Sequence, residues 1–223
     1  MKKFNTLDIA ALIIWLLPAA YLLYVYPTLP DTVPVHFGLT GAPDRYGAKS
    51  EFLIGPMVIM GMSVLVYLLF KFLPAIDPKK FVKYGEPTFQ KIGMGVLVLM
   101  AALSIEITLS AINKSFKADK LVLPMMGLFF AFMGNLMHNI KPNYFAGIRT
   151  PWTLEDNDTW RVTHRLAGKL WFAGGIILAI MALSLPLKAG LIAYMSALFI
   201  MIMIPVIYSY VYYKNHHRDK TTG

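Results

Sequence analysis

Long apolar stretches alternate with short polar ones along the whole chain, and this pattern predicts the fold. Six apolar runs each supply the roughly 20 helical residues needed to cross a hydrocarbon core of about 30 Å. These runs cover residues 7–26, 53–73, 92–112, 121–140, 166–187 and 191–213. The pattern therefore predicts an all-α integral membrane protein, a bundle of about six transmembrane helices.

The composition agrees with this prediction and excludes several other classes. Hydrophobic residues make up 57% of the chain and charged residues only 15%, which is typical of a multi-pass membrane protein. The chain has no cysteine, so it has neither a disulfide framework nor a thiolate metal site. Helix packing and the bilayer must hold it together.

The distribution of the 21 Lys and Arg residues predicts the orientation. Most of them fall in the N-terminus, the second and fourth connections and the C-terminal tail. Because Lys and Arg concentrate on the cytoplasmic side, we expect both termini to lie in the cytoplasm. The same residues would attract anionic membrane lipids at the cytoplasmic face. Direct nucleic-acid binding is not predicted, since it would require a basic soluble domain.

The first connection, residues 27–52, is then an outer loop rich in proline and glycine. Its prolines disfavour helix, and Val33, Val35 and Phe37 alternate with polar or proline positions as in a short strand. A turn is expected at residues 41–44, and the loop should be ordered. The candidate functional residues of this loop are Pro34, His36, Gly41 and Asp44. His36 is either a hydrogen-bonded surface residue, or a pH-sensitive group or ligand.

Two polar features interrupt the apolar runs. Glu106 lies inside the third span, where a carboxyl group is expensive to bury and faces the bundle interior by default. It either has a functional role or pairs with a lysine near the outer interface. Asn135 and His138, followed by Asn139, share one side of the fourth helix. They predict either interhelical hydrogen bonds or a proton or metal site with Glu106; the ligand spacing argues against a metal, and no cofactor is expected.

The fourth connection contains the signals for a new helix. Pro142 and Gly147 stop helices, whereas Pro151 suits a first helical position with Thr150 as its cap. Thr153 followed by Asp156 matches a capping box, so we expect a cytoplasmic interfacial helix to begin between residues 150 and 154.

This helix carries two stripes at helical spacing. The first stripe consists of three aromatic residues and an alanine: Trp160, His164, Ala167 and Trp171. The second stripe, on the adjoining face, is basic: Arg161, Arg165 and Lys169.

The order of residues in this region resembles the SdpI-type family of bacterial immunity membrane proteins. The resemblance rests on G-N at 134–135, K-P-N-Y-F-x-G-I-R-T-P-W-T-L at 141–154 and W-x-x-T-H-R-x-x-G at 160–168. The candidate residues of this signature are Asn135, His138, Asn143, Gly147, Arg149, Thr150, Pro151, Trp152, Trp160, His164 and Arg165. Residues 29–49 also resemble a short membrane domain of unassigned function that often precedes it. We therefore expect an N-terminal region, 1–90, and an SdpI-like region, 91–223, with the signature loop at 141–165.

The resemblance implies a function for the chain. Family members protect a cell from a secreted antimicrobial peptide toxin, and a signalling role through a cytoplasmic regulatory protein is also ascribed to the family. It implies no catalytic residues. The alternative from the residues themselves is a small proton-coupled transporter or permease that uses Glu106. An enzyme is not predicted, because the sequence offers no nucleophile–base pair or metal triad with suitable spacing.

Overall fold

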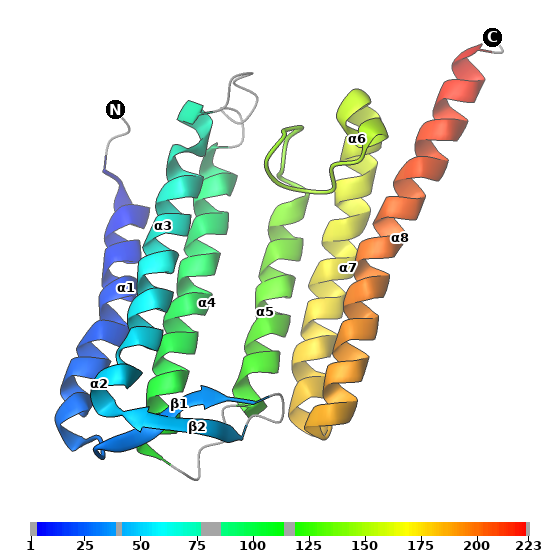
Figure 1. Cartoon of the computed structure of the whole chain (residues 1–223). Coiled ribbons are helices and arrows are strands. Elements are labelled where there is room, and N and C mark those ends of the chain that lie inside the picture. The colour runs from blue at the N-terminus through cyan, green and yellow to red at the C-terminus, as the bar shows by residue number, and fades with distance from the viewer. Residues whose placement is uncertain (1–3, 39–41, 77–85, 114–118, 222–223) are drawn as a thin grey trace. The chain divides into compact units, whose positions relative to one another are not determined.

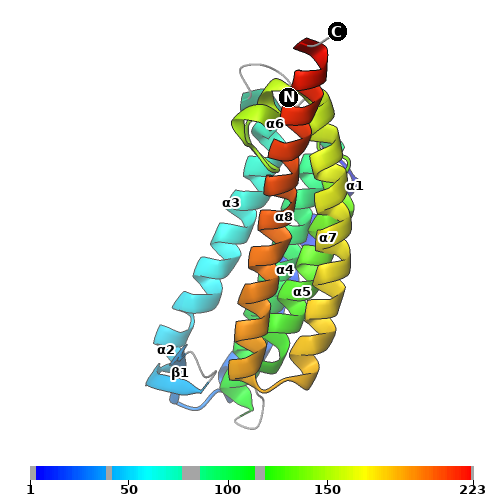
Figure 2. The same cartoon turned by 90° about the vertical axis from the view of Figure 1, so that its right-hand side faces the viewer.

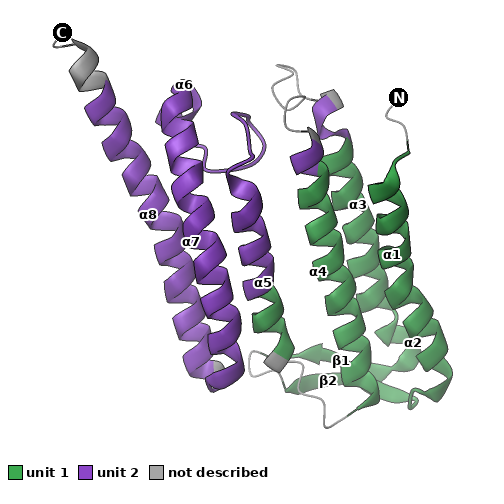
Figure 3. Cartoon of the chain, turned by 180° about the vertical axis from the view of Figure 1, so that it is seen from behind, with its two compact units in different colours: residues 1–71, 90–126 green, residues 72–89, 127–223 purple. Residues whose placement is uncertain are grey.

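The computed structural model describes residues 4–38, 42–76, 86–113 and 119–221, and most of them are helical (Figure 1). The chain divides into two compact units (Figure 3). Unit 1 comprises residues 1–71 and 90–126, and unit 2 comprises residues 72–89 and 127–223. The predicted turn residue Gly41 and the basic connection at 77–85 lie outside the described residues.

Three long helices run side by side in unit 1. They are α1 (Thr6–Val25), α3 (Ile54–Ile76, of which residues up to 71 belong to this unit) and α4 (Glu86–Ile112, from residue 90 on). Ala11, Tyr67 and Leu97, one from each helix, form a buried cluster. The Trp15 indole nitrogen donates to the carbonyl oxygen of Met60 at 3.1 Å, which joins α1 to α3.

A β-hairpin covers the end of unit 1 that lies away from the N-terminus (Figure 1). After a short 3-10 helix, η1 (Tyr26–Thr28), strand β1 (Thr32–Phe37) pairs antiparallel with β2 (Pro43–Ala48), and α2 (Lys49–Phe52) leads into α3. Val33 is fully buried in the cluster that also contains Leu22, Phe52 and Ala111. The strand predicted from the alternating pattern is therefore confirmed.

The all-α prediction is wrong in this one respect, because the chain contains a two-stranded sheet. Its prolines explain the difference: Pro34 and Pro43 lie within the strands, where they prevent helix formation. A two-stranded ribbon is marginal alone and is stabilised when it packs against helices. Here β1 inserts Val33 between α1 and α4.

Unit 2 contains the C-terminal part of α5 (Asp119–Met137), the short α6 (Pro151–Glu155), α7 (Asn157–Ser184) and α8 (Leu187–Thr221). Helices α7 and α8 pack along each other, and α6 contacts both near one end (Figure 2). The Trp171 indole nitrogen of α7 donates to the Met201 carbonyl oxygen of α8 at 3.1 Å.

Helices α5 and α7 approach each other through glycines. A Cβ atom added to Gly127 would lie 2.6 Å from the Ala179 backbone nitrogen, and one added to Gly168 would lie 2.9 Å from the Gly134 carbonyl oxygen. Both distances are shorter than real Cβ contacts, so only glycine allows these backbones to touch. Close packing of small residues is a common way for helices to associate in lipid, where the hydrophobic effect does not drive them together.

Five of the described helices are long and apolar enough to cross a membrane. They cover Thr6–Thr28, Lys49–Pro74, Pro87–Ile112, Asn157–Ser184 and Lys188–His216, and a sixth apolar helix, Leu121–Met137, is shorter. The prediction of a multi-pass helical membrane protein is confirmed. The fourth predicted span ends early because a turn follows Met137, with the Ile140 amide donating to the Met137 carbonyl oxygen at 3.2 Å.

The expected interfacial helix differs in its form. It is divided into the separate α6 and the first turns of α7, which continues without a break to Ser184. The stripes predicted on it are present: Trp160, His164 and Ala167 are buried, whereas Arg161 and Arg165 are exposed.

Replacing Gly134 by alanine tests the close approach of α5 and α7. The added Cβ would meet the backbone of Phe172 and Trp171, so the helices must separate. We expect Gly134→Ala to lower the free energy of unfolding in detergent micelles by about 1–3 kcal/mol. The matched control is Gly61→Ala on α3, where nothing lies within 4 Å of the added atom. There, stability should stay the same or rise by up to about 1 kcal/mol; equal stability of both variants would contradict the contact.

Candidate functional site

The segment between α5 and α6, residues 138–150, folds back as a loop that we call the clasp loop. Asn143 organises its first half and is 2% exposed. Its side-chain nitrogen donates to the carbonyl oxygens of Lys141 (2.8 Å) and Ala146 (3.1 Å). Its side-chain oxygen accepts from the amides of Phe145 (2.7 Å) and Ala146 (2.8 Å). The amide group therefore has all its donors and acceptors satisfied, as a buried polar side chain requires.

His164 connects the clasp loop to α7. Its Nδ1 lies 2.8 Å from the Trp160 carbonyl oxygen, which can only accept, so Nδ1 carries the hydrogen. Its Nε2 is then free to accept the Ile148 amide hydrogen, at 3.0 Å. The imidazole is 1% exposed and stacks on the Trp160 ring, with ring centroids 4.0 Å apart. Because both nitrogens are engaged, this histidine acts as a structural link and is not available as a metal ligand.

Gly147 makes this link possible in two ways. Its φ angle is +106°, a left-handed conformation that residues with a side chain rarely adopt. A Cβ at this position would also collide with the His164 Nε2 atom. The glycine therefore allows the backbone to turn and lets the imidazole reach the Ile148 amide.

Trp160 holds the other end of the clasp loop. Its indole nitrogen donates to the Ile140 carbonyl oxygen at 2.8 Å, and the side chain is 2% exposed. Ile140 follows the end of α5, so this bond ties that end to the second turn of α7. Trp160 and His164 together fix both ends of the clasp loop on one face of one helix.

Two caps set the starts of α6 and α7. Thr150 caps α6 and Pro151 lies in its first turn, as predicted, and Thr150 forms a capping box with Thr153. The predicted capping box of Thr153 with Asp156 is wrong, because Asp156 is itself the cap of α7. Its carboxylate accepts from the Thr159 amide at 2.7 Å and from the Thr159 hydroxyl at 2.5 Å. The α6 helix ends at the residue before this cap.

Helix α6 is tethered to α8. The Trp152 indole nitrogen donates to the Ser209 hydroxyl at 2.7 Å, and the Trp152 ring meets the Tyr210 ring edge-on. The Tyr213 hydroxyl donates to the Glu155 carboxylate at 2.8 Å. The signature region thus contacts α5, α7 and α8 at one end of unit 2.

The remaining signature residues lie at the surface. The Arg149 side chain is exposed and donates to the Tyr144 carbonyl oxygen of the clasp loop. Arg165 is exposed on α7. Asn135 and His138 are also exposed; Asn135 lies in the last turn of α5, and His138 lies in the turn that follows Met137. They line a surface groove of unit 2 with Arg165.

A second candidate site lies beside the hairpin of unit 1. A cleft of about 430 Å³ is lined by Pro34, Val35, His36, Phe37, Arg45, Glu51, Phe52, Ile54, Gly55, Pro56 and Ile107. Two polar contacts lie at its rim: His36 Nδ1 lies 2.6 Å from an Asp44 oxygen, within hydrogen-bond distance, and Arg45 of β2 forms an ion pair with Glu51 of α2 at 2.5 Å. The His36 and Asp44 side chains are exposed, so this site is accessible.

Glu106 is buried in α4, at 3% exposure. Ala101 and Ser110 of the same helix are buried as well, as expected for a closely packed seam. The Ser110 hydroxyl donates to the Glu106 backbone carbonyl at 2.9 Å. The Glu106 side chain is therefore not at the exposed surface.

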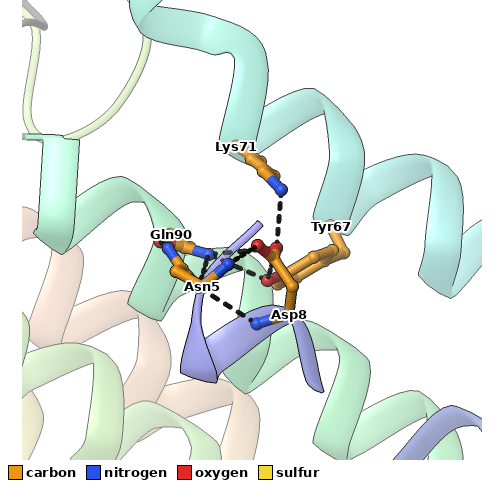
Figure 4. A network of polar contacts seen from close by, with 5 residues as sticks. All are labelled: Asn5, Asp8, Tyr67, Lys71 and Gln90. Atoms are coloured by element: carbon orange, nitrogen blue, oxygen red, sulfur yellow. Dashed lines mark hydrogen bonds and ion pairs between the residues drawn. The ribbon is translucent and has the colours of Figure 1, made fainter. Parts of the chain in front are cut away.

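A buried polar network in unit 1 was not predicted from the sequence (Figure 4). Asp8 of α1 forms an ion pair with Lys71 of α3 at 2.8 Å, and the Tyr67 hydroxyl donates to the same carboxylate oxygen at 2.8 Å. Gln90 of α4 donates to the Tyr67 hydroxyl at 2.9 Å. Asn5 caps α1 with Asp8 and donates to the Gln90 side-chain oxygen at 3.0 Å.

This network joins α1, α3 and α4 at the end of unit 1 opposite the hairpin. One local signal was present in the sequence: Asn5 and Asp8 have the spacing of a capping box just before an apolar run. The partners Lys71 and Gln90 gave no signal, because they lie far away in the chain and resemble ordinary residues at the ends of spans. Among the described residues, no group of three or more His, Asp or Glu side chains is arranged to hold a metal ion.

His164→Phe tests the link between the clasp loop and α7. The ring keeps its stacking on Trp160 but loses the acceptor for the Ile148 amide, and an unsatisfied buried amide costs about 1–3 kcal/mol. We expect that loss of stability together with faster hydrogen exchange at Ile148. The matched control is His138→Phe, at an exposed histidine with no hydrogen bond in the described ranges. Unchanged exchange at Ile148 in the first variant would contradict the link.

Comparison with known proteins gives consistent matches over most of the chain. Residues 139–209 match the SdpI/YfhL protein family, and residues 13–61 match a domain of unknown function (DUF1648). A Bacillus subtilis (strain 168) protein, "Immunity protein SdpI", is 26% identical over 215 residues, 96% of this chain and 97% of that protein. An "Uncharacterized protein" of Archaeoglobus fulgidus is 41% identical over 63 residues, 28% of this chain and 32% of that protein. No solved structure matches.

The family match contains the clasp loop from residue 139 onward, both caps and the two buried aromatic residues that hold the loop on α7. The shorter match contains β1, β2 and most of α1, so the hairpin belongs to it. The resemblance seen in the sequence is thus confirmed: residues 139–209 match the SdpI/YfhL protein family, and residues 13–61 match the DUF1648 domain.

Proposed function

We propose that this protein is an immunity protein of the bacterial inner membrane that protects the cell from a secreted, membrane-active peptide toxin. The observation that carries the proposal is the similarity to Immunity protein SdpI, which extends over 96% of this chain and 97% of that protein. A match over nearly the full length of both chains includes the hairpin as well as the clasp loop, so it relates whole proteins and not one shared helix pair.

The hairpin cleft is the surface that we propose for contact with the toxin. Val35, Phe37 and Ile54 give it apolar walls, and Arg45 and Glu51 place charges of both signs at its rim. A membrane-active peptide combines apolar and charged side chains, and such a cleft can accommodate both. A two-stranded sheet also has open edges to which an extended peptide can add.

We propose that both termini and the clasp loop lie in the cytoplasm and that the hairpin lies outside. The positive-inside rule supports this orientation, because most Lys and Arg residues fall at the termini and in the second and fourth connections. The exposed Arg149 and the clasp loop around it would then form a docking surface for a cytoplasmic regulatory protein. Anionic lipids would surround the same face.

The exposure of two polar side chains argues against proton-coupled transport. The transport hypothesis required Asn135 and His138 to lie inside the helix bundle, but both side chains are exposed in unit 2. Glu106 is buried, yet a single buried carboxyl does not make a pathway. We propose no enzymatic activity.

Expression in a toxin-sensitive bacterium tests the proposal. Cells that produce the protein should survive concentrations of a membrane-active peptide toxin that kill cells with an empty vector. We expect Phe37→Ser with Ile54→Ser to reduce the protective effect by about tenfold or more, since buried apolar anchors dominate peptide interfaces. The matched control is Tyr46→Ser, an exposed hairpin residue outside the cleft, which should protect like the wild type.

Cysteine labelling in the same cells tests the proposed orientation of the protein in the membrane. A cysteine introduced at Ala42 should react with an impermeant thiol reagent from outside, whereas one at Asn157 should react only after lysis; both residues are exposed and the native chain has no cysteine. Unchanged killing across a broad peptide panel, with the protein well expressed in the membrane, would contradict the proposed function. Equal loss of protection in the cleft variant and the Tyr46 variant would contradict only the contact surface.

A further inference from the structure

A groove of about 580 Å³ runs along unit 2 between α5 and the first half of α7. Gly134 and Gly168 form its floor, because they bring the two backbones together without side chains. Its other lining residues are Asn135, His138, Arg161, Arg165, Lys169 and Phe172. The immunity hypothesis does not use this groove.

The groove carries a concentrated positive charge. Arg161, Arg165 and Lys169 are spaced four residues apart, so they share one face of α7, and all three are exposed. Arg161 donates to Asp158 at 3.0 Å. Within the described parts of the chain, neither Arg165 nor Lys169 makes a hydrogen bond or ion pair, and no acidic residue lines the groove. Its cations are therefore available to an anionic ligand.

One end of the groove continues into an apolar surface. Phe172 follows the three basic residues along α7 and is 50% exposed. The exposed apolar side chains of Ile176, Ile180 and Leu183 extend the same side of the helix for about 16 Å beyond it. A ligand that matches both parts has an anionic head and a long apolar tail.

We propose that this groove binds an anionic phospholipid. The phosphate lies between Arg165 and Lys169, with the His138 ring and the Asn135 amide as further hydrogen-bonding groups, and an acyl chain follows Phe172. Helix α7 is one of the helices long and apolar enough to span a membrane, and the basic residues lie within its first turns. The phosphates of a leaflet occupy that depth at the end of a span.

Two other anions fit less of the surface. Free inorganic phosphate would satisfy the basic residues but leave the apolar line beyond Phe172 without a role. An acidic peptide would pair with the cations, but an apolar line along a spanning helix faces acyl chains and not a water-soluble segment. The phospholipid is the ligand that uses every part of the groove.

Native mass spectrometry of the full-length protein, delipidated in detergent, tests the proposal with phosphatidylglycerol as the probe. In the wild type, phosphatidylglycerol should bind more tightly than phosphatidylcholine, and millimolar inorganic phosphate should not displace it. We expect Arg165→Gln with Lys169→Gln to weaken binding by about thirtyfold, since each basic residue near an anionic lipid contributes roughly fivefold. The matched control, Lys141→Gln with Lys214→Gln, removes the same charge from exposed positions outside the groove and should bind normally.

Further variants distinguish binding of the lipid headgroup from binding of the acyl chain, and both from an effect on folding. Arg165→Lys with Lys169→Arg keeps the charge and should retain the lipid, while Phe172→Ser should shorten the lifetime of the bound state without changing the thermal stability of the protein. Equal weakening in the control variant, displacement by inorganic phosphate, or tighter binding of a polyglutamate peptide than of the lipid would each overturn the proposal. None of these results depends on protection from a toxin.

Discussion

Burial of polar side chains among apolar helices is the constraint on which this structure depends. A polar group removed from water costs several kcal/mol in an apolar environment unless the protein supplies a partner. Asp8 and Lys71 satisfy that requirement with each other at 2.8 Å, and Tyr67 and Gln90 complete the contacts around the carboxylate. Because the partners come from different helices, each contact also fixes one helix against another.

In unit 2 the same requirement for a hydrogen-bond partner applies to backbone groups. The Ile148 amide and the Ile140 carbonyl lie in a loop without regular structure, and His164 and Trp160 of α7 provide their partners. A histidine and a tryptophan one turn apart can therefore hold both ends of a loop. Gly147 is needed at the point where the loop meets the imidazole. The family signature thus describes a set of contacts that closes one end of the helices.

The sequence predicted those features that depend on neighbours in the chain. Apolar runs of spanning length located the long helices of the described residues, alternation located β1, and the Thr150–Pro151 pair located the start of α6. Contacts between distant residues were not predictable, since nothing near Lys71 indicates that Asp8 is its partner, 63 positions away. The exposure of His138 was missed because helical spacing was assumed to continue past Met137, where a turn begins.

These contacts also limit which residues of the family signature can contact a partner. Asn143, Trp160 and His164 are buried and fully engaged within the clasp loop and α7, so they support the surface rather than bind a partner directly. The exposed signature residues around them include Arg149 on the loop and Arg165 on α7. A matching sequence signature in a relative therefore implies the same scaffold, whereas the partner depends on exposed positions.

A double-mutant cycle on Asp8 and Lys71 tests most directly whether buried pairing holds the helices together. Asp8→Asn and Lys71→Met should each lower the free energy of unfolding in mixed micelles by about 3–5 kcal/mol, and the double variant should lose clearly less than their sum. The exposed pair Asp158 and Arg161 serves as the reference, with a coupling below about 1 kcal/mol. Additive losses at Asp8 and Lys71, or a coupling no larger than that of the exposed pair, would contradict the account.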